Sequence, residues 1–190
     1  MGTEEDTRRF AKGIHKSATR LLTLINEIIR LSELDVSKGE VEQERLNLLV
    51  MANACAEMLQ ISAQKHGVSI SVEGEDCYIM GNRTMMDELL YNLVDNAIRY
   101  NYENGKVHVR VHQEETRVIL TVSDTGIGIS KEHQERIFER FYRVDKSRSK
   151  STGGTGLGLA IVKHILVSHG AKLELNSEPG QGTTMKVIFE

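Results

Sequence analysis

Cysteine is scarce in this sequence, and long apolar runs are missing from it. The two cysteines, Cys55 and Cys77, form neither a Cys-x-x-Cys pair nor a metal-ligand spacing, so we expect two small core residues of a reduced, cytoplasmic protein. No apolar run reaches the length of a membrane helix. The hydrophobic content of 39% and charged content of 27% are ordinary for a soluble globular protein. A net charge of −3 gives no general attraction to nucleic acid. We therefore expect neither a nucleic-acid partner nor membrane contact.

Glycine is present but unevenly distributed. Eight of the 16 glycines occupy three short segments, at positions 126, 128, 153, 154, 156, 158, 180 and 182. Glycine lets backbone N–H groups approach a ligand closely, and a helix that starts directly after such a loop offers the positive end of its dipole to an anion. Residues 157–166 have the apolar spacing of a helix and follow the second glycine cluster at once. This arrangement predicts a phosphate-binding site.

The familiar sequence motifs that contain these residue types do not fit. A P-loop requires Gly-Lys-Ser/Thr, whereas Leu157 follows Gly156. The dinucleotide fingerprint follows the first strand of a βαβ unit, whereas residues 154–158 follow a polar, basic stretch. Residues 124–126 also spell the Asp-Thr-Gly triplet of aspartic proteases. That chemistry needs a second carboxylate from another copy of the motif or from a dimer mate, and the sequence contains no second copy.

The chain divides near residue 38. Residues 4–37 are predicted to form one long helix, because apolar residues recur mostly three or four positions apart from Phe10 onwards. The apolar face of this helix is too wide for an exposed, solitary helix, and Lys38-Gly39 is expected to end it. We therefore separate residues 1–38 from one substantial domain at residues 39–190. The alternative is a core helix of the same domain.

Beyond the long helix, strands and helices alternate. Strands are predicted at 41–46, 68–73, 77–80, 106–112, 117–123, 173–176 and 183–189, and helices at 47–66, from Asn82 to Tyr100 and after residue 157. Asn82 is suited to cap its helix. The strands at 106–112 and 117–123 each have one alternating apolar face, as in a hairpin over a core. The pattern predicts an α+β fold, a two-layer α/β sandwich in which one layer of helices covers a mixed sheet.

Four motifs in a fixed order resemble those of one family. Residues 92–100 read Asn-Leu-Val-Asp-Asn-Ala-Ile-Arg-Tyr, 124–129 read Asp-Thr-Gly-Ile-Gly-Ile, 138–143 read Phe-Glu-Arg-Phe-Tyr-Arg and 153–159 read Gly-Gly-Thr-Gly-Leu-Gly-Leu. They are similar to the N, G1, F and G2 boxes of the ATP-binding catalytic domain of sensor histidine protein kinases. The resemblance covers about residues 40–190 and implies the Bergerat ATP-binding fold. The long helix resembles the second helix of the dimerisation and phosphoacceptor hairpin, whose dimer is a four-helix bundle.

The resemblance implies a role for the N and G1 boxes. Asn96 is the Mg²⁺ ligand, and Asn92 lies beside it as a second catalytic residue. Arg99 is a catalytic residue where the family usually has a lysine against phosphate, which keeps the charge but changes the geometry. Tyr100 is the aromatic beside the nucleotide, and Asp124 accepts a hydrogen bond from the adenine amine. Without the family, the two asparagines also fit a solvated pair, and Asp124 also fits a turn former.

The remaining nucleotide contacts that the resemblance implies lie in three loops. Residues 143–152 match the mobile ATP lid, although such a segment also fits a solvated, charged loop. Phe138, Phe141 and Tyr142 are expected to pack the base of the lid. Besides Asn96, Tyr100 and Asp124, the expected nucleotide-binding residues are Gly126, Gly128, Ile129, Arg143, Lys146, Arg148, Gly154, Thr155, Gly156, Leu157 and Gly158. The turn at 180–183 is expected to be structural.

Two absences refine the class of enzyme. Superfamily members that hydrolyse ATP or phosphorylate serine carry a glutamate as general base four residues before the metal asparagine, and this sequence has Asn92 there. The family's acceptor box has an acidic residue after its histidine and a proline four residues later. The only proline is Pro179, and no histidine fits this pattern. We therefore expect a catalytic fragment without its acceptor helix, in which His15, His108 and His112 are ordinary surface residues.

The sequence thus predicts the ATP-binding catalytic fragment of a sensor histidine kinase. The intact parent is expected to transfer the γ-phosphoryl group of Mg-ATP to a histidine and then to an aspartate of a response-regulator receiver domain, in two-component signal transduction. It is expected to be a homodimer through its hairpin helices and the cytoplasmic portion of a membrane-anchored sensor. Two alternatives stay open. One is a superfamily ATPase or anti-sigma-type serine kinase, and the other is a nucleotide-binding scaffold without catalysis.

Overall fold

The fold is seen in a computed structural model that describes residues 3–36, 42–144 and 154–190. Its centre is a five-stranded sheet with the strand order β2-β4-β5-β7-β6. The strands are β2 (Ser69–Gly74), β4 (Lys106–Glu114), β5 (Arg117–Asp124), β7 (Gly182–Phe189) and β6 (Lys172–Glu178). β2 runs parallel to β4, and every other neighbouring pair is antiparallel. The mixed sheet that the sequence predicts is therefore confirmed.

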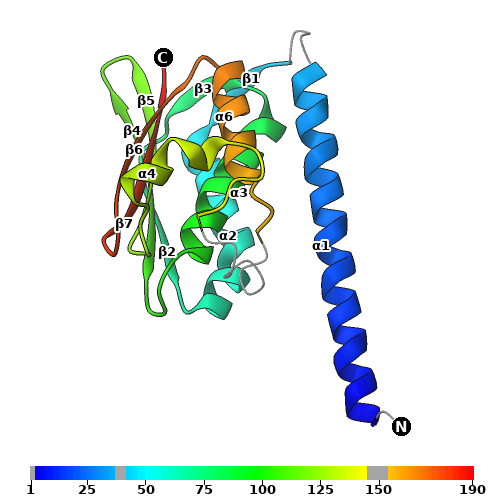
Figure 1. The fold of residues 1–190 in the computed structure, drawn as a ribbon. Coiled ribbons are helices and arrows are strands. Elements are labelled where there is room, and N and C mark those ends of the chain that lie inside the picture. The colour runs from blue at the N-terminus through cyan, green and yellow to red at the C-terminus, as the bar shows by residue number, and fades with distance from the viewer. Residues whose placement is uncertain (1–2, 37–41, 145–153) are drawn as a thin grey trace.

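Three helices cover one face of this sheet, as Figure 1 shows. They are α2 (Leu48–His66), α3 (Arg83–Arg99) and α6 (Gly158–Ser168). β1 (Glu44–Asn47) and β3 (Tyr78–Gly81) form a separate two-stranded antiparallel sheet. Two short helices, α4 (Lys131–Gln134) and the 3-10 helix η1 (Arg136–Phe138), follow β5. The predicted two-layer α+β architecture is confirmed, whereas the separate pairing of β1 with β3 was not predicted.

The alternating apolar residues of the strands build the core. Val107, Val109 and Val111 of β4 are fully buried and face the helical layer, where Leu89 and Leu90 of α3 are also fully buried. Fully burying one such side chain contributes roughly 1.5–3 kcal/mol of hydrophobic free energy. Both cysteines are free and buried, as expected. Burial raises the pKa of the Cys55 thiol to about 12.

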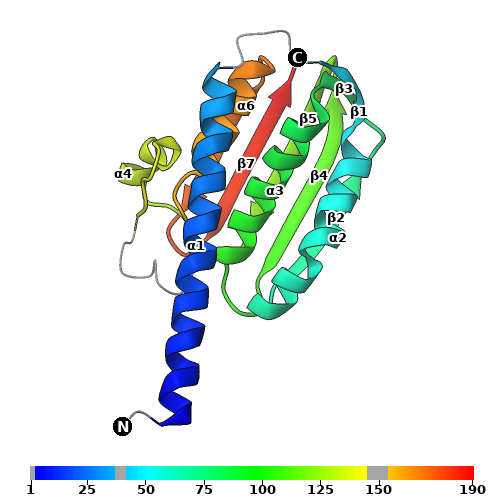
Figure 2. The ribbon, with the colours of Figure 1, turned by 90° about the vertical axis from the view of Figure 1, so that its right-hand side faces the viewer.

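The long N-terminal helix α1 (Glu4–Val36) lies on the side of the helical layer away from the sheet. Its N-terminal turns extend past the rest of the molecule (Figure 2), and Phe10 and Ile14 are largely exposed there. Near its other end, Leu31 is only 5% exposed against the core. The expected helix stop at residues 38–39 lies outside the described residues, and the assignment of α1 to a dimerisation hairpin stays a prediction. Within the described ranges, no helix is long and apolar enough to cross a membrane.

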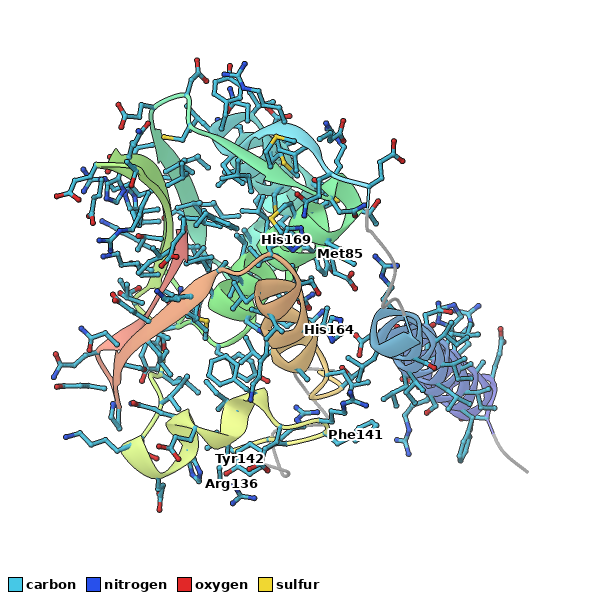
Figure 3. The ribbon with its side chains drawn as sticks, turned by 90° about the horizontal axis from the view of Figure 1, so that it is seen from above. Met85, Arg136, Phe141, Tyr142, His164 and His169 are labelled. Carbon is cyan, nitrogen blue, oxygen red and sulfur yellow. The ribbon has the colours of Figure 1, made fainter. Side chains whose placement is uncertain are left out.

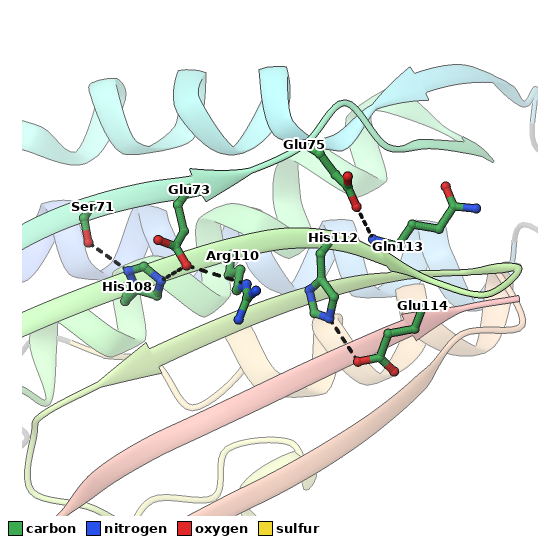
Figure 4. Close-up of polar contacts among 8 residues, drawn as sticks. All are labelled: Ser71, Glu73, Glu75, His108, Arg110, His112, Gln113 and Glu114. Carbon is green, nitrogen blue, oxygen red and sulfur yellow. Dashed lines mark hydrogen bonds and ion pairs between the residues drawn. The ribbon is translucent and has the colours of Figure 1, made fainter.

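The other face of the sheet is polar. Figure 4 shows pairs of side chains that join β2 to β4: the Ser71 hydroxyl lies 3.0 Å from His108 Nδ1, and His108 Nε2 lies 3.1 Å from a Glu73 carboxylate oxygen. His112 Nε2 contacts Glu114 at 3.0 Å, and its side chain is 23% exposed. The partial exposure of His108 agrees with a surface role, whereas His112 is more buried than a typical surface residue.

Candidate functional site

The start of α3 fixes the positions of the two N-box asparagines. Asn82 Oδ1 accepts a hydrogen bond from the Met85 amide at 3.0 Å, which confirms the predicted cap. The Asn82 amide in turn donates to His169 Nε2 at 3.1 Å, and Figure 3 shows His169 beside this end of α3. Asn92 and Asn96 are half-buried further along α3. They are one turn apart and therefore share a face of the helix.

The N box touches the loop that leads into α6. The Asn92 amide nitrogen donates to the Glu88 carbonyl at 2.8 Å, and a Cβ added to Gly158 would lie 2.5 Å from the Asn92 amide oxygen. Only glycine permits this approach of α6 to α3. At the C-terminal end of the N box, the Tyr100 hydroxyl lies 3.5 Å from the position of a Cβ on Gly154.

The G1 box packs on the end of the N box in the same way. The Ile127 amide donates to the Tyr100 carbonyl at 3.0 Å, and a Cβ on Gly126 would lie 2.3 Å from that oxygen. Gly128 has φ +67°, and a Cβ there would lie 1.9 Å from the Glu178 carbonyl. These glycines are therefore needed for close backbone packing as well as for any ligand contact.

The F box completes the assembly. The Phe141 amide donates to the Gly156 carbonyl at 2.9 Å, and Gly156 has φ +82°. The Arg143 guanidinium donates to the Gly154 carbonyl. The N and F boxes, which are far apart in the sequence, thus meet residues 154–158 at the start of α6, and the G1 box packs on the end of the N box. Lys146 and Arg148 of the expected lid lie outside the described residues.

The aromatic residues of the F box have different surroundings. Phe138 packs against the core, and the Tyr142 hydroxyl lies 2.7 Å from His133 Nδ1. The guanidinium of Arg136 lies 4.2 Å from the centroid of the Tyr142 ring (Figure 3). Phe141, by contrast, is 56% exposed and has φ +64°. The expectation that Phe141 packs the lid base is therefore wrong for the described residues, whereas Phe138 and Tyr142 do pack.

Asp124 stands at the last position of β5, as predicted. Its Oδ1 accepts hydrogen bonds from the amides of Gly126 at 2.8 Å and Thr183 at 3.2 Å. Burial raises the pKa of this carboxyl above its usual range, and the two backbone hydrogen bonds lower it in part. A half-buried carboxylate at the end of a strand is suited to accept a hydrogen bond from a ligand amine.

The loop before α6 can contact a ligand with its backbone rather than with its apolar side chains. The Thr155 hydroxyl accepts from the Leu157 amide at 3.3 Å, and the Leu157 side chain is fully buried. Any ligand contact of Leu157 must therefore come from its backbone. The Ile129 amide already donates to Ser177 Oγ at 2.8 Å. The first N–H groups of an α-helix have no partner within the helix, so the start of the eleven-residue α6 is suited to bind an anion.

Arg99 forms an ion pair with Asp95, a residue to which the sequence motifs assign no role. Its Nε lies 2.5 Å from an Asp95 carboxylate oxygen, and its side chain also hydrogen-bonds Tyr91. Asp95 is buried, which raises the pKa of its carboxyl, and Arg99 lowers that pKa in part. The spacing of four residues between an acid and a base on a predicted helix is the signal that could have found this pair.

Glu27 of α1 is a second residue to which the sequence motifs assign no role. Glu27 is half-buried, and its carboxylate accepts a hydrogen bond from the Thr155 side chain. Its other oxygen, Oε2, is buried and has no hydrogen-bond partner among the described residues. No motif includes this residue, so only the docking of α1 reveals it.

Comparison with known proteins places these motifs in one family. A family model described as histidine kinase-, DNA gyrase B-, and HSP90-like ATPase matches residues 81–190. The sensor-like histidine kinase SenX3 of Mycolicibacterium smegmatis is 36% identical over 181 residues, which cover 95% of this chain and 47% of that protein. The chain therefore spans about half the length of this curated relative.

Solved structures agree with the fold over the whole chain. The full-length structure of ShkA in complex with AMPPNP matches with a TM-score of 0.82 and 26% identity, over 100% of this chain and 39% of that one. The histidine kinase ThkA in complex with the response regulator protein TrrA matches with a TM-score of 0.76 and 25% identity, over 100% of this chain and 52% of that one.

The raised pKa of Asp124 predicts a dependence of stability on pH. Because burial raises this pKa, the folded protein holds the proton more tightly than the unfolded chain, and stability is lost as the pH rises through the folded pKa. Asp124→Asn carries no charge, and its amide oxygen can still accept the Gly126 hydrogen bond. We expect its unfolding free energy relative to wild type to increase between about pH 4 and about pH 7.

Urea denaturation at both pH values measures this difference. Asp87→Asn, which removes an exposed carboxylate on α3, is the control for the loss of a surface charge. If the free energy of unfolding of Asp124→Asn relative to wild type is the same at both pH values, the raised pKa of Asp124 is contradicted.

Proposed function

The chain belongs to the histidine kinase-, DNA gyrase B- and HSP90-like ATPase family, as the ATP-binding catalytic domain of a sensor histidine kinase, and from this premise we propose the function of the intact protein. It transfers the γ-phosphoryl group of Mg-ATP to a histidine outside this chain, and then to an aspartate of a response-regulator receiver domain. The observation that carries this proposal is the packing of the four boxes on one another: the N and F boxes meet the G2 box at the start of α6, and the G1 box packs on the end of the N box.

The site residues divide between the two ends of the nucleotide. Asp124 accepts a hydrogen bond from the adenine amine, and Tyr100 flanks the nucleotide. The phosphates lie against the backbone of residues 154–158, where the dipole of α6 favours negative charge. Arg99 and Arg143 add positive charge nearby. Both also have partners within the protein, Asp95 and the Gly154 carbonyl respectively, so their geometry is set before a nucleotide arrives.

This chain would hold the cation with few side chains of its own. Within the described ranges, no group of three or more His, Cys, Asp or Glu side chains could bind a metal. Mg²⁺ commonly keeps several waters and takes one or two protein ligands together with substrate phosphates. The half-buried amide of Asn96 fits such a site as the protein ligand, with Asn92 beside it. When bound, Mg²⁺ supplies charge neutralisation of the phosphates.

We infer a histidine as the acceptor because Asn92, and not a glutamate, stands four residues before Asn96 on α3. Asn92 stands where hydrolytic relatives carry a glutamate, and its amide nitrogen is used to bond the Glu88 carbonyl. The role of this chain is therefore positioning and electrostatic stabilisation. The ThkA structure contains a response regulator protein, which supports a receiver domain as the partner. The wide apolar face of α1 supports a homodimer of the intact protein. An ATPase or serine kinase is the alternative.

The first functional prediction concerns Asp124. Asp124→Asn should fold normally but bind ADP and a non-hydrolysable ATP analogue at least about tenfold more weakly, because the site loses a half-buried carboxylate acceptor and presents a donor to the adenine amine. Calorimetric titration measures the affinity, with Asp87→Asn as control. Wild-type affinity in a folded Asp124→Asn protein would remove Asp124 from the nucleotide site.

The second prediction concerns Asn96. Asn96→Ala removes the amide oxygen proposed to bind Mg²⁺, so the enhancement of analogue binding by Mg²⁺ should fall to near zero and leave a weaker, metal-insensitive affinity. The measurement is a titration with and without Mg²⁺. Asn53→Ala, at an exposed position on α2, is the control. Equal Mg²⁺ enhancement in wild type and Asn96→Ala would contradict the assignment.

The third prediction tests the reaction itself. The chain should bind Mg-ATP without labelling itself, because its histidines are not placed in line with the γ-phosphate, and such placement provides effective molarities of about 10⁵ M or more. Adding the complete hairpin domain of the intact protein, with its own catalytic site disabled, should give labelling of that domain. Transfer should be slow because the encounter is bimolecular.

Radiolabelled ATP with each protein alone and with both together is the assay, and acid-labile, base-stable label identifies phosphohistidine. Strong labelling of the chain alone, or acid-stable label on serine, would replace the histidine kinase proposal with the serine kinase alternative.

A further inference from the structure

The C-terminal half of α1 reaches the proposed phosphate site. α1 lies beside α6 (Figures 2 and 3), and it is attached to α3 by an ion pair between Arg30 Nε and Glu88 Oε2 at 3.0 Å. Leu24 and Leu31 pack against the core on either side of Glu27. These contacts place the Glu27 carboxylate between α3 and the loop before α6.

The surroundings of Glu27 resemble those of a bound anion. The Thr155 side chain donates a hydrogen bond to the carboxylate, and Arg99 is close enough to lower its pKa electrostatically. Burial acts in the opposite direction and is the larger effect, so the pKa of Glu27 is raised overall. Glu88 and Asp95 add like charge nearby. Glu27 Oε2 is buried without a partner among the described residues. A carboxylate in this setting is poorly compensated.

A path of contacts joins Asp124 to Glu27. The Asp124 carboxylate bonds the Gly126 amide, Gly126 packs on the Tyr100 carbonyl, and the Tyr100 hydroxyl adjoins Gly154, which precedes Thr155. A nucleotide with its base at Asp124 and its phosphates at residues 154–158 therefore points its last phosphate toward α1.

We propose that Glu27 is a specificity-determining residue, whose carboxylate occupies the place of the terminal phosphate at Thr155 and Arg99 and so lowers the affinity for a triphosphate more than that for a diphosphate. This inference rests on the proposed nucleotide site. Two anions cannot share these donors, because both would be partly desolvated and would repel one another. A triphosphate therefore displaces the Glu27 carboxylate, whereas a diphosphate is too short to do so. Thermodynamic linkage makes this effect reciprocal. Docking of α1 lowers the affinity for a triphosphate by the same factor by which a bound triphosphate lowers the equilibrium constant for docking of α1.

The central experiment compares Glu27→Gln with wild type. Glutamine keeps an oxygen that can accept from Thr155 but removes the negative charge. Calorimetric titration in the presence of Mg²⁺ should show about fivefold tighter binding of the non-hydrolysable ATP analogue AMPPNP, the size of effect that one partly solvated charge gives. The affinity for ADP should stay within about twofold. Glu5→Gln, at an exposed position on the same helix, should change neither affinity.

A second variant tests docking through the ion pair between α1 and α3. Arg30→Gln breaks the ion pair with Glu88, so it should weaken the attachment of α1 and raise the affinity for AMPPNP relative to ADP. Arg8→Gln, which breaks the exposed pair with Glu4 on the same helix, is its control. Hydrogen exchange should show faster exchange at residues 24–31 with AMPPNP than with ADP in the wild type.

The outcomes separate the two levels of the proposal. No binding of either nucleotide to wild type would contradict the proposed function itself. Binding of both with an equal gain, or no gain, in Glu27→Gln would overturn only the role of Glu27. A third outcome is tighter AMPPNP binding in Glu27→Gln but not in Arg30→Gln, with equal hydrogen exchange at residues 24–31 in AMPPNP and ADP. Glu27 would then act as a fixed charge, and the proposed displacement of α1 would be overturned.

Discussion

The close approach of α6 to α3 is the contact on which the candidate site depends. The Asn92 amide oxygen lies so near Gly158 that no side chain fits between the two helices. This approach fixes the start of α6. The loop before α6 contacts the F box through the hydrogen bond from the Phe141 amide to the Gly156 carbonyl, and it contacts the N box where Gly154 lies near the Tyr100 hydroxyl. Because packed elements shift as units rather than deform, a change at this contact would move several boxes together.

The site also uses polar groups whose cost of burial is only partly offset. Asp124 is stabilised by two backbone amides, and Asp95 by Arg99, yet burial remains the larger effect on the pKa of each carboxyl. A core built only for stability would place apolar groups there. Perturbed carboxyls that gather where several motifs meet are typical of functional sites.

The sequence allowed much of the fold to be predicted, because the signals are local. The apolar alternation of β4 and β5, the Asn82 cap and the glycine turns each depend on neighbouring residues. The separate β1–β3 sheet was not predictable, since pairing depends on contacts between segments far apart in the chain. In the site, the boxes were identified by their resemblance to those of a known family, whereas the contacts of Glu27 depend on how a distant helix docks. Phe141 was misjudged because an aromatic residue in a motif does not by itself indicate burial.

The edges of the main sheet determine how this protein can associate. β6 has one sheet partner among the described strands, β7, and its exposed residues include the charged Lys172, Glu174 and Glu178. Charged edge strands resist the addition of a strand from another chain, which is the usual first step of β-aggregation. Assembly through added strands at this edge is therefore disfavoured. Substitutions on the apolar face of α1 can then be studied without aggregation through β6.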